Sequence, residues 1–165
     1  MFKKILFTLL TLLIVYSCAV VGYRIFEPSL DIASDPDTAY LDIDSLDQYI
    51  LSSPEGSTHY LFFYSRVNKD CVYVRDTVLS VVQKETQLNL SRIIEIADIT
   101  SKDRSLDLAG LYEDWGISNY PAFASYTVQN GEIVMNNMLV YDGKKPLTAA
   151  DIESWLELNG LYTID

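Results

Sequence analysis

The residues of this chain that could do chemistry gather in one short stretch, FYSRVNKDC, residues 63–71. The preceding run THYLF is typical of a buried strand, and Cys71 follows a short polar loop where a helix is expected to begin. A thiolate at a helix N-terminus is stabilised by unpaired backbone N–H groups and by the helix dipole, which lowers the pKa of the thiol. Such a thiolate attacks disulfides, and a second cysteine then resolves the mixed disulfide. The loop contains only Cys71, so a dithiol cycle within this loop is in question from the start.

Composition narrows the chemistry further. The chain has 165 residues, enough for one domain with a core, and its 12 Lys+Arg against 23 Asp+Glu give a net charge of −11. This acidity disfavours nucleic acid as a partner. The only other cysteine is Cys18, and the single histidine, His59, is expected to pack or hydrogen-bond on the first strand. These are too few ligands for a zinc site, and no loop has the DxDxDG spacing of a calcium site, so no metal and no cofactor are expected.

An uninterrupted apolar segment, ILFTLLTLLIVYSCAVV, spans residues 5–21. At about 1.5 Å of rise per residue, this segment with the next two residues is just long enough to cross a membrane. Two lysines precede it, whereas Arg24 and then mainly acidic residues follow, so the positive-inside rule places the N-terminus in the cytoplasm. We expect a single-pass protein of the cell membrane whose C-terminal domain is extracytoplasmic.

Three fates of the apolar segment stay open. An uncleaved anchor over residues 1–25 is preferred, because the apolar stretch continues past every plausible cleavage position. A signal peptide would instead be cut near residues 17–19. In the third alternative VYSC resembles the bacterial lipobox, with Cys18 as the lipidated residue, although one of its positions is bulkier than usual. All three fates export the rest of the chain, which divides into an acidic tether over residues 26–44 and a domain over residues 45–165.

Hydrophobic periodicity divides the domain into alternating helices and strands. Helices are expected over residues 46–53, 70–88, 105–115 and 148–160, and strands over residues 58–65, 91–99 and on both sides of Asn130–Gly131, a pair suited to a tight hairpin turn. Alternating β and α units imply parallel pairing, and the hairpin adds an antiparallel edge. The predicted fold class is therefore α/β, with a mixed central sheet and helices on both faces.

This order of elements resembles the thioredoxin-like superfamily, and two local motifs support the likeness over roughly residues 45–160. FYSRVNKDC resembles the strand-to-helix active site of that family, in which an aromatic strand end leads into Cys-x-x-Cys. WGISNYPAF, residues 115–123, resembles the second signature, a turn leading to a proline whose preceding peptide bond is cis. That proline corresponds to Pro121, with Tyr120 before it. The resemblance implies that the backbone near Tyr120 binds an extended peptide through β-type hydrogen bonds.

The resemblance also implies a degenerate active site, Asn-Lys-Asp-Cys in place of Cys-x-x-Cys. The attacking cysteine of the family corresponds to Asn68 and the second cysteine to Cys71, with Lys69 and Asp70 between them. An amide is no nucleophile for disulfides, so a dithiol–disulfide cycle within this chain is excluded. The buried carboxylate that some members have on the first strand corresponds to Phe62, which cannot relay protons.

Three interpretations of Cys71 stay open. In the first it is a small buried residue at the start of a core helix. In the second it is a monothiol that forms mixed disulfides, its thiolate favoured by Arg66 and Lys69 and opposed by Asp70. In the third a longer loop puts Cys71 itself at the attacking position, with Val74 where the resolving cysteine would be.

Two functions follow from these alternatives. The first is a non-enzymatic, membrane-anchored module that binds an extracytoplasmic protein or peptide partner through the face around Tyr120 and Pro121. The second is a monothiol thiol–disulfide oxidoreductase or exchange factor that uses Cys71 in an oxidising compartment. Thioredoxin-like accessory proteins of bacterial peptide export are similar in outline, at the level of fold alone.

Overall fold

One five-stranded sheet forms the centre of the domain. The computed structural model of the chain describes residues 40–163. The strands are β1 (Tyr40–Asp42), β2 (Thr58–Tyr64), β3 (Glu95–Asp98), β4 (Ala122–Gln129) and β5 (Glu132–Val140), and they lie in the order β1-β3-β2-β4-β5. Strand β3 pairs in parallel with both β1 and β2, whereas β4 runs antiparallel to β2 and to β5. The predicted mixed sheet, with parallel strands at one side and an antiparallel hairpin at the other, is confirmed.

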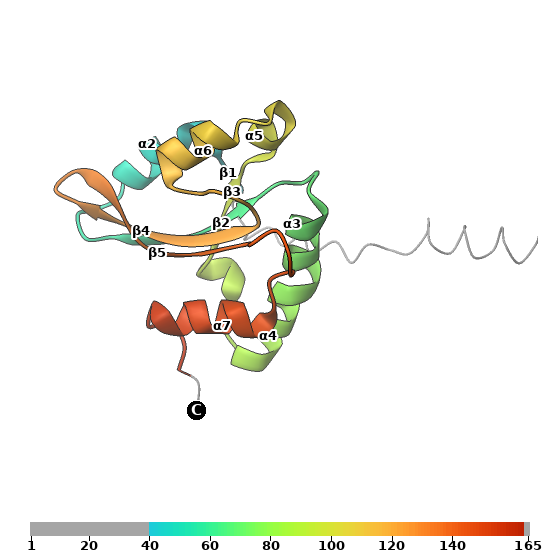
Figure 1. Cartoon of the computed structure of the whole chain (residues 1–165). Coiled ribbons are helices and arrows are strands. Elements are labelled where there is room, and N and C mark those ends of the chain that lie inside the picture. The colour runs from blue at the N-terminus through green and yellow to red at the C-terminus, as the bar shows by residue number, and fades with distance from the viewer. Residues whose placement is uncertain (1–39, 164–165) are drawn as a thin grey trace, which may run out of the picture. The chain divides into compact units, whose positions relative to one another are not determined.

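Helices cover both faces of this sheet, as predicted. Figure 1 shows α2 (Leu46–Leu51), α5 (Thr100–Ser105) and α6 (Leu108–Trp115) on one face and α3 (Lys69–Tyr73), α4 (Leu79–Thr86) and α7 (Ala149–Leu158) on the other. Short pieces complete the set: the 3-10 turns η2 (Ile43–Ser45) and η4 (Leu90–Arg92), and the π-helical η3 (Val74–Val78), which joins α3 to α4.

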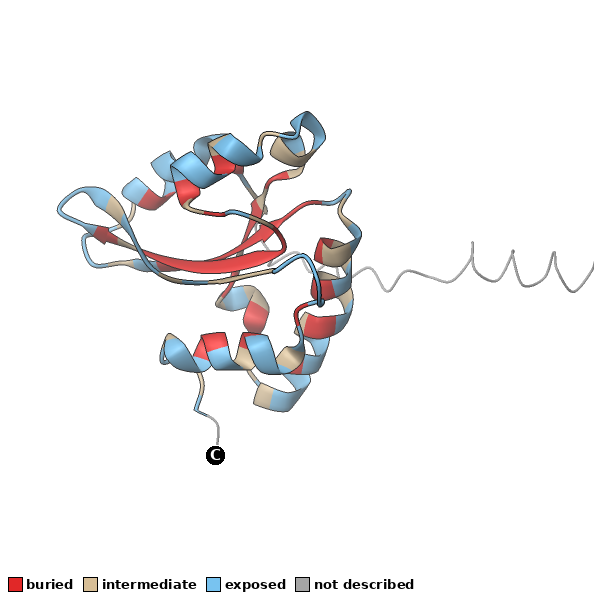
Figure 2. Cartoon of the chain, in the orientation of Figure 1, coloured by how far each residue is buried: buried red, intermediate tan, exposed pale blue. Residues whose placement is uncertain are grey.

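The core lies on both sides of β2, the strand that leads into the FYSRVNKDC loop. Residues 61–64 of this strand are all buried, because helices cover the sheet above and below them (Figure 2). Successive side chains alternate between the two layers. Phe62 stacks on Phe123 with ring centroids 4.5 Å apart, and Phe123 packs against Trp155 of α7. Phe63 packs against Trp115 of α6.

Several turn and cap assignments made from sequence are confirmed. Asn130 and Gly131 both have positive φ, 55° and 75°, as a tight hairpin of this kind requires. Thr148 and Asp151 form a capping box at the start of α7. Gly116 ends α6 in the left-handed conformation, with its N–H bonded to the carbonyl of Tyr112.

Three boundaries differ from the prediction. The acidic tether was expected to run to Asp44, but residues 40–44 belong to the folded domain, where the three-residue strand β1 pairs with β3. A strand this short, ending in an aspartate, gives no periodic signal. The helix expected to start at Ser105 starts at Leu108, where the carboxylate of Asp107 caps α6. Ser105 instead ends a separate helix that was not predicted, α5, and its hydroxyl donates back to the carbonyls of Ser101 and Lys102.

The strand predicted over residues 91–99 is shorter than expected. Its first residues form the 3-10 turn η4, and only Glu95–Asp98 pair with the neighbouring strands. The apolar residues at the start of the run are buried without being in the sheet, which apolar periodicity alone does not distinguish from strand pairing.

The anchor over residues 1–25, the possible lipidation at Cys18 and the tether up to residue 39 lie outside the described residues. Between residues 40 and 163, no helix is long and apolar enough to cross a membrane. The topology predicted from the N-terminal segment therefore stays a prediction.

Candidate functional site

The loop after β2 ends at Asn68, which is the N-cap of α3. Its backbone is extended (φ −92°, ψ 124°), and its side-chain oxygen accepts hydrogen bonds from the backbone N–H groups of Asp70 (2.9 Å) and Cys71 (3.0 Å). These N–H groups have no partner within the helix, so a cap at this position satisfies them. They are also the donors that would stabilise a thiolate at the start of a helix. A neutral amide oxygen therefore occupies the place where a reactive thiolate would be held.

Cys71 lies one turn further into the helix and is fully buried. Burial raises the pKa of its thiol to about 12; a backbone hydrogen bond with Ser65 opposes the shift, and the charges of Asp103 and Asp70 add to it. At neutral pH the sulfur is consequently a protonated, inaccessible thiol. Asn68, and not Cys71, stands at the helix N-terminus.

The charged residues around the loop do little to activate this thiol. The guanidinium of Arg66 donates to the carboxylate of Asp98 (3.0 Å) and lies over the ring of Tyr40, 4.8 Å from its centroid. Its charge is therefore directed toward β1 and β3. Lys69 is exposed to solvent, whereas Asp70 is half-buried beside Cys71.

The Tyr120–Pro121 peptide bond is cis, as the sequence motif predicted. The Tyr120 hydroxyl donates to one carboxylate oxygen of Asp103 (2.6 Å), and the hydroxyl of the buried Ser65 donates to the other (2.5 Å). Desolvation and then the neighbouring Asp103 carboxylate raise the pKa of Tyr120. Asp103 thus ties three segments together: the end of β2, helix α5 and the cis-proline loop. Sequence reasoning did not identify Asp103, because no local pattern places it near either motif.

A further side chain fixes the cis-proline loop. Asn119 accepts the backbone N–H of Tyr120 on its side-chain oxygen (2.9 Å) and donates through its side-chain nitrogen to the carbonyl of Tyr141 (3.1 Å). The carbonyl of Pro121 accepts the backbone N–H of Tyr141 (3.1 Å). A peptide that paired with the N–H of Tyr120 would therefore have to displace the amide of Asn119.

The site as a whole lacks the parts of a dithiol centre. Asn68 has no sulfur, and Phe62, which corresponds to the buried carboxylate of some related proteins, is enclosed in the aromatic stack with Phe123. No proton relay runs through that position. What the arrangement provides is a face made of Asn68, Lys69, Asn119, Tyr120 and Pro121, which we call the cis-proline face. Lys69 is exposed on it, Asn68 and Asn119 are half-buried, and Tyr120 and Pro121 are buried beneath.

A second polar cluster lies at the opposite end of β2 and was only partly anticipated. The buried His59 contacts the carboxylate of Glu95 through Nδ1 and the hydroxyl of Ser53 through Nε2, both at 2.9 Å, and Tyr49 donates to the same carboxylate. A hydrogen-bonded chain of Ser, His and Glu side chains is the arrangement found in the catalytic triad of serine hydrolases. However, the backbone N–H of Ser53 donates to the carbonyl of Ile50, so it is not free to stabilise an oxyanion. We regard the cluster as structural.

The fold is thioredoxin-like. The strand order β1-β3-β2-β4-β5, the active-site-like loop between β2 and α3, and the cis-proline at the start of β4 all lie where that fold has them. The predicted resemblance to the thioredoxin-like superfamily is confirmed at this level.

Comparison with known proteins gives structural neighbours only. Thioredoxin f2 of Chlamydomonas reinhardtii is 13% identical over 76% of this chain and 99% of its own, with a TM-score of 0.49. A Plasmodium falciparum thioredoxin is 19% identical (75% and 89% covered, TM-score 0.45), and the C-terminal domain of Neisseria meningitidis DsbD in its reduced form is 16% identical (73% and 99%, TM-score 0.45). No protein-family model matches the sequence. No curated protein matches it either.

Proposed function

We propose that this protein is a membrane-anchored, extracytoplasmic thioredoxin-like module that binds a protein or peptide partner through its cis-proline face and runs no dithiol cycle. The anchor and its orientation are supported by the apolar segment over residues 5–21 and by the two lysines before it. The binding role is supported by the thioredoxin-like placement of the loop and the cis-proline side by side.

The observation that supports this proposal most is the position of the Asn68 amide. Its oxygen accepts hydrogen bonds from the backbone N–H groups of Asp70 and Cys71. The donors that would stabilise a thiolate at the start of the helix are therefore already bonded to the capping amide. A site with no nucleophile at that point can still present its surface and its neighbouring loops to a partner.

The alternative, a monothiol enzyme that uses Cys71, has less support. A mixed disulfide requires a thiolate that a substrate sulfur can reach. Cys71 is fully buried, and burial raises its pKa to about 12. Both properties oppose the reaction.

Site-specific crosslinking in cells tests the binding face. A photoreactive side chain would replace Val67, which is 52% exposed next to Asn68, and in a matched control it would replace Leu158, which is 69% exposed at the end of α7. We expect a discrete crosslinked partner from position 67 and none from position 158, with the product unchanged by Cys71→Ala. A product that disappears with Cys71→Ala would favour the monothiol, and no product from position 67 would overturn the proposed face.

Protease accessibility tests the topology. External protease added to intact spheroplasts should degrade the domain, and it should leave the domain intact if the positive-inside assignment is wrong. This measurement is independent of the partner.

A further inference from the structure

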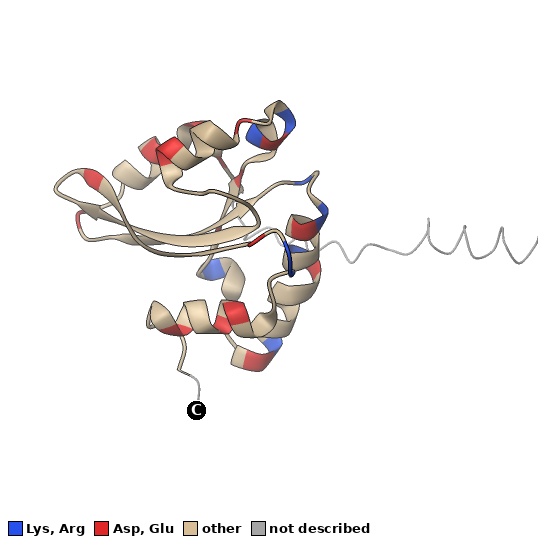
Figure 3. Ribbon diagram, in the orientation of Figure 1, with Lys and Arg blue, Asp and Glu red and all other residues tan. Residues whose placement is uncertain are grey.

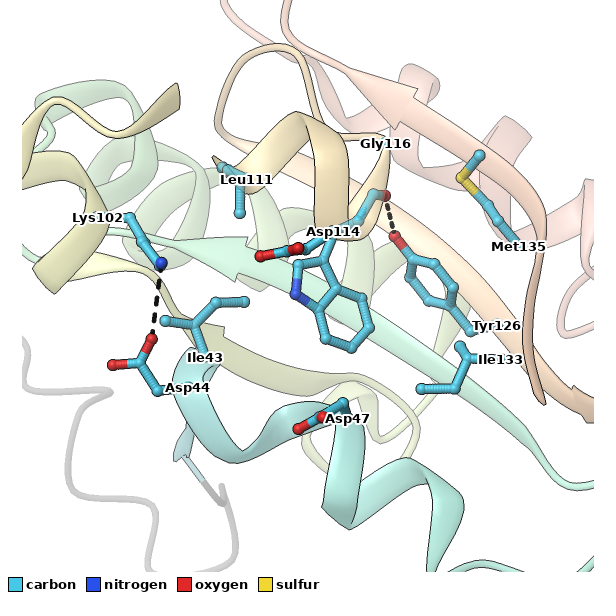
Figure 4. A pocket seen from close by; sticks show the side chains of 11 residues that line it. Ile43, Asp44, Asp47, Lys102, Leu111, Asp114, Gly116, Tyr126, Ile133 and Met135 are labelled. Atoms are coloured by element: carbon cyan, nitrogen blue, oxygen red, sulfur yellow. Dashed lines mark hydrogen bonds and ion pairs between the residues drawn. The ribbon is translucent and has the colours of Figure 1, made fainter. Parts of the chain in front are cut away.

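A cavity lies on the α2–α6 side of the sheet, and it shares no lining residue with the cis-proline face. It has a volume of about 520 Å³, within the range of small-ligand sites. Its lining is drawn in Figure 4 and comes from η2, α2, α5, α6 and the hairpin. The floor is apolar and aromatic: Ile43, Leu111, Trp115, Tyr126, Ile133 and Met135.

Two aromatic rings, those of Trp115 and Tyr126, form part of the floor and contact each other edge to face. The rings of Trp115 and Tyr126 are perpendicular (89°) with centroids 5.4 Å apart. The Tyr126 hydroxyl donates to the carbonyl of Trp115 (2.7 Å), so this polar group already has its partner. The floor therefore presents apolar and aromatic surface to an occupant, and the occupant does not have to accept a hydrogen bond from the Tyr126 hydroxyl.

The rim of the cavity is acidic. Asp44, Asp47 and Asp114 line it, and in Figure 3 the ribbon of α2 and α6 carries positions coloured as Asp or Glu. Lys102 is the one basic residue of the lining, and its ammonium is shared between the carboxylates of Asp107 (3.2 Å) and Asp44 (3.7 Å). Within residues 40–163, the carboxylates of Asp47 and Asp114 accept no hydrogen bond and form no salt bridge. The pKa of the Lys102 ammonium is raised by Asp107 first, and the charge of Asp114 also acts on this ammonium and helps to raise its pKa. Two carboxylates without a direct partner thus stand beside an apolar floor.

The apolar floor and the acidic rim exclude several kinds of ligand. An anion is disfavoured, because the single ammonium is already neutralised by two carboxylates. A metal ion has no site, since the described residues contain no group of three or more His, Cys, Asp or Glu side chains placed to hold one. The chain's own tether is a poor occupant as well: residues 26–39 contain four acidic residues and no lysine or arginine.

We propose that this cavity is a binding site for an amphipathic organic cation, an ammonium or guanidinium group attached to an apolar body. The apolar body would lie on the floor around Trp115 and Tyr126, where burial of apolar surface and the aromatic rings favour it. The cation would lie at the rim between Asp47 and Asp114. A lysine or arginine side chain next to an apolar residue of a partner protein and a free aromatic amine share this chemistry.

Methyl NMR of the 165-residue chain in detergent tests the site with defined probes. The chain has three methionines, and Met135 lines the cavity, so its methyl signal, assigned through Met135→Leu, reports locally. The probes are the N-acetylated dipeptide amide Phe-Lys, its charge-reversed counterpart Phe-Glu, and phenethylamine. We expect saturable shifts of the Met135 methyl signal with Phe-Lys and none with Phe-Glu. A Phe-Lys response without a phenethylamine response indicates a peptide source, and the converse indicates a small amine.

Charge-neutral variants complete the test. Asp47→Asn combined with Asp114→Asn should weaken Phe-Lys binding roughly tenfold, because the cation loses both carboxylates that attract it. The control Glu157→Gln removes an exposed carboxylate from α7 and should leave binding unchanged. Equal shifts with Phe-Lys and Phe-Glu, binding that ignores the double variant, or no saturable binding by any probe would each overturn the proposal. None of these outcomes bears on the cis-proline face, whose test is the crosslinking from position 67.

Discussion

The side-chain oxygen of Asn68 lies 3.0 Å from the backbone nitrogen of Cys71 and accepts its hydrogen bond. One residue thus caps α3 and stands where a nucleophile would be, while the only cysteine of the described domain is buried behind it. The cap makes the degenerate loop a stable structural element. Some substitutions at position 68 should therefore change the free energy of unfolding, and others should change the reactivity of the loop toward disulfides.

Asn68→Ala should lower the free energy of unfolding by about 1 kcal/mol, because two backbone N–H groups lose their acceptor. Asn68→Asp and Asn68→Ser keep a side-chain acceptor and should stay close to the wild type. Urea unfolding followed by circular dichroism measures the difference. Equal stability of the alanine and serine variants would show that the cap does not contribute.

Asn68→Cys should create a dithiol site and give the chain more disulfide reductase activity than the wild type has. The new thiolate would face the N–H groups of Asp70 and Cys71, which should lower its pKa. Cys71 lies three residues on and is placed to resolve the mixed disulfide intramolecularly once its thiol is deprotonated, so the raised pKa of Cys71 should keep this turnover slow at neutral pH and make it rise with pH. Insulin reduction with dithiothreitol measures the gain. In the control Asn68→Cys with Cys71→Ser, turnover should be lost; a folded Asn68→Cys variant without activity contradicts a thioredoxin-type geometry.

Cys71 should react with alkylating agents only when the domain unfolds. Its folded pKa of about 12 lies above the ordinary value of 9.0, so its contribution to stability is complete below about pH 9 and is lost as the pH rises toward 12. Iodoacetamide labelling across a urea series should follow the unfolding transition. Between about pH 9 and 10 the wild type should lose stability more steeply than Cys71→Ala, which retains every tyrosine, by up to about 1 kcal/mol per pH unit. Because the chain also contains Cys18, the labelled residue is located by peptide mapping; rapid labelling of Cys71 in the native chain would contradict this and favour the monothiol.

Much of this fold can be predicted from local sequence patterns, and the reasons for the failures are physical. The hairpin turn at Asn130–Gly131 and the capping box at Thr148 are encoded within a few residues, so they are recognisable without the rest of the chain. Strand β1 is not, because three residues become a strand only through pairing with β3. The contacts of Asp103 with Ser65 and Tyr120 cannot be predicted from local sequence either, because they join segments far apart in the chain.

In the candidate site, too, some features are encoded in local sequence and others depend on tertiary contacts. The motif around Asn68 and the cis bond before Pro121 could be located from their spacing to neighbouring strands and helices. The complete burial of Cys71 and the direction of Arg66 toward Asp98 depend on packing between distant segments. A prediction that Arg66 favours a thiolate therefore considered charge without orientation.

Tyr120→Phe should destabilise the domain by about 1–2 kcal/mol, because it removes one of the two hydroxyl donors to the Asp103 carboxylate. The control Tyr73→Phe removes the hydroxyl of a tyrosine that is 47% exposed and should be nearly neutral. Thermal unfolding of the three proteins measures both effects. Equal melting temperatures for all three would mean that the Asp103 contact is not maintained in solution.

Glu153→Gln should stabilise the domain near neutral pH. Glu153 is on α7 and Glu85 is on α4; desolvation first, and then the neighbouring carboxyl group of Glu85, raise the pKa of Glu153 above its ordinary value of 4.5. A carboxyl group with a raised folded pKa contributes stability that is complete below the unfolded pKa and is lost as the pH rises through the folded one. At neutral pH the wild type therefore bears an unfavourable charge between α4 and α7, which the amide removes.

The advantage of Glu153→Gln should consequently shrink as the pH falls toward about 4.5, where the wild-type carboxyl group is protonated as well. Urea unfolding at neutral and at mildly acidic pH measures this change. Glu157→Gln, on the same helix but exposed, is the control and should show no such pH-dependent gain. A gain from Glu153→Gln that does not vary with pH would show that it does not arise from the raised pKa of this carboxyl group, because any pKa difference between the folded and unfolded states makes the stability difference depend on pH.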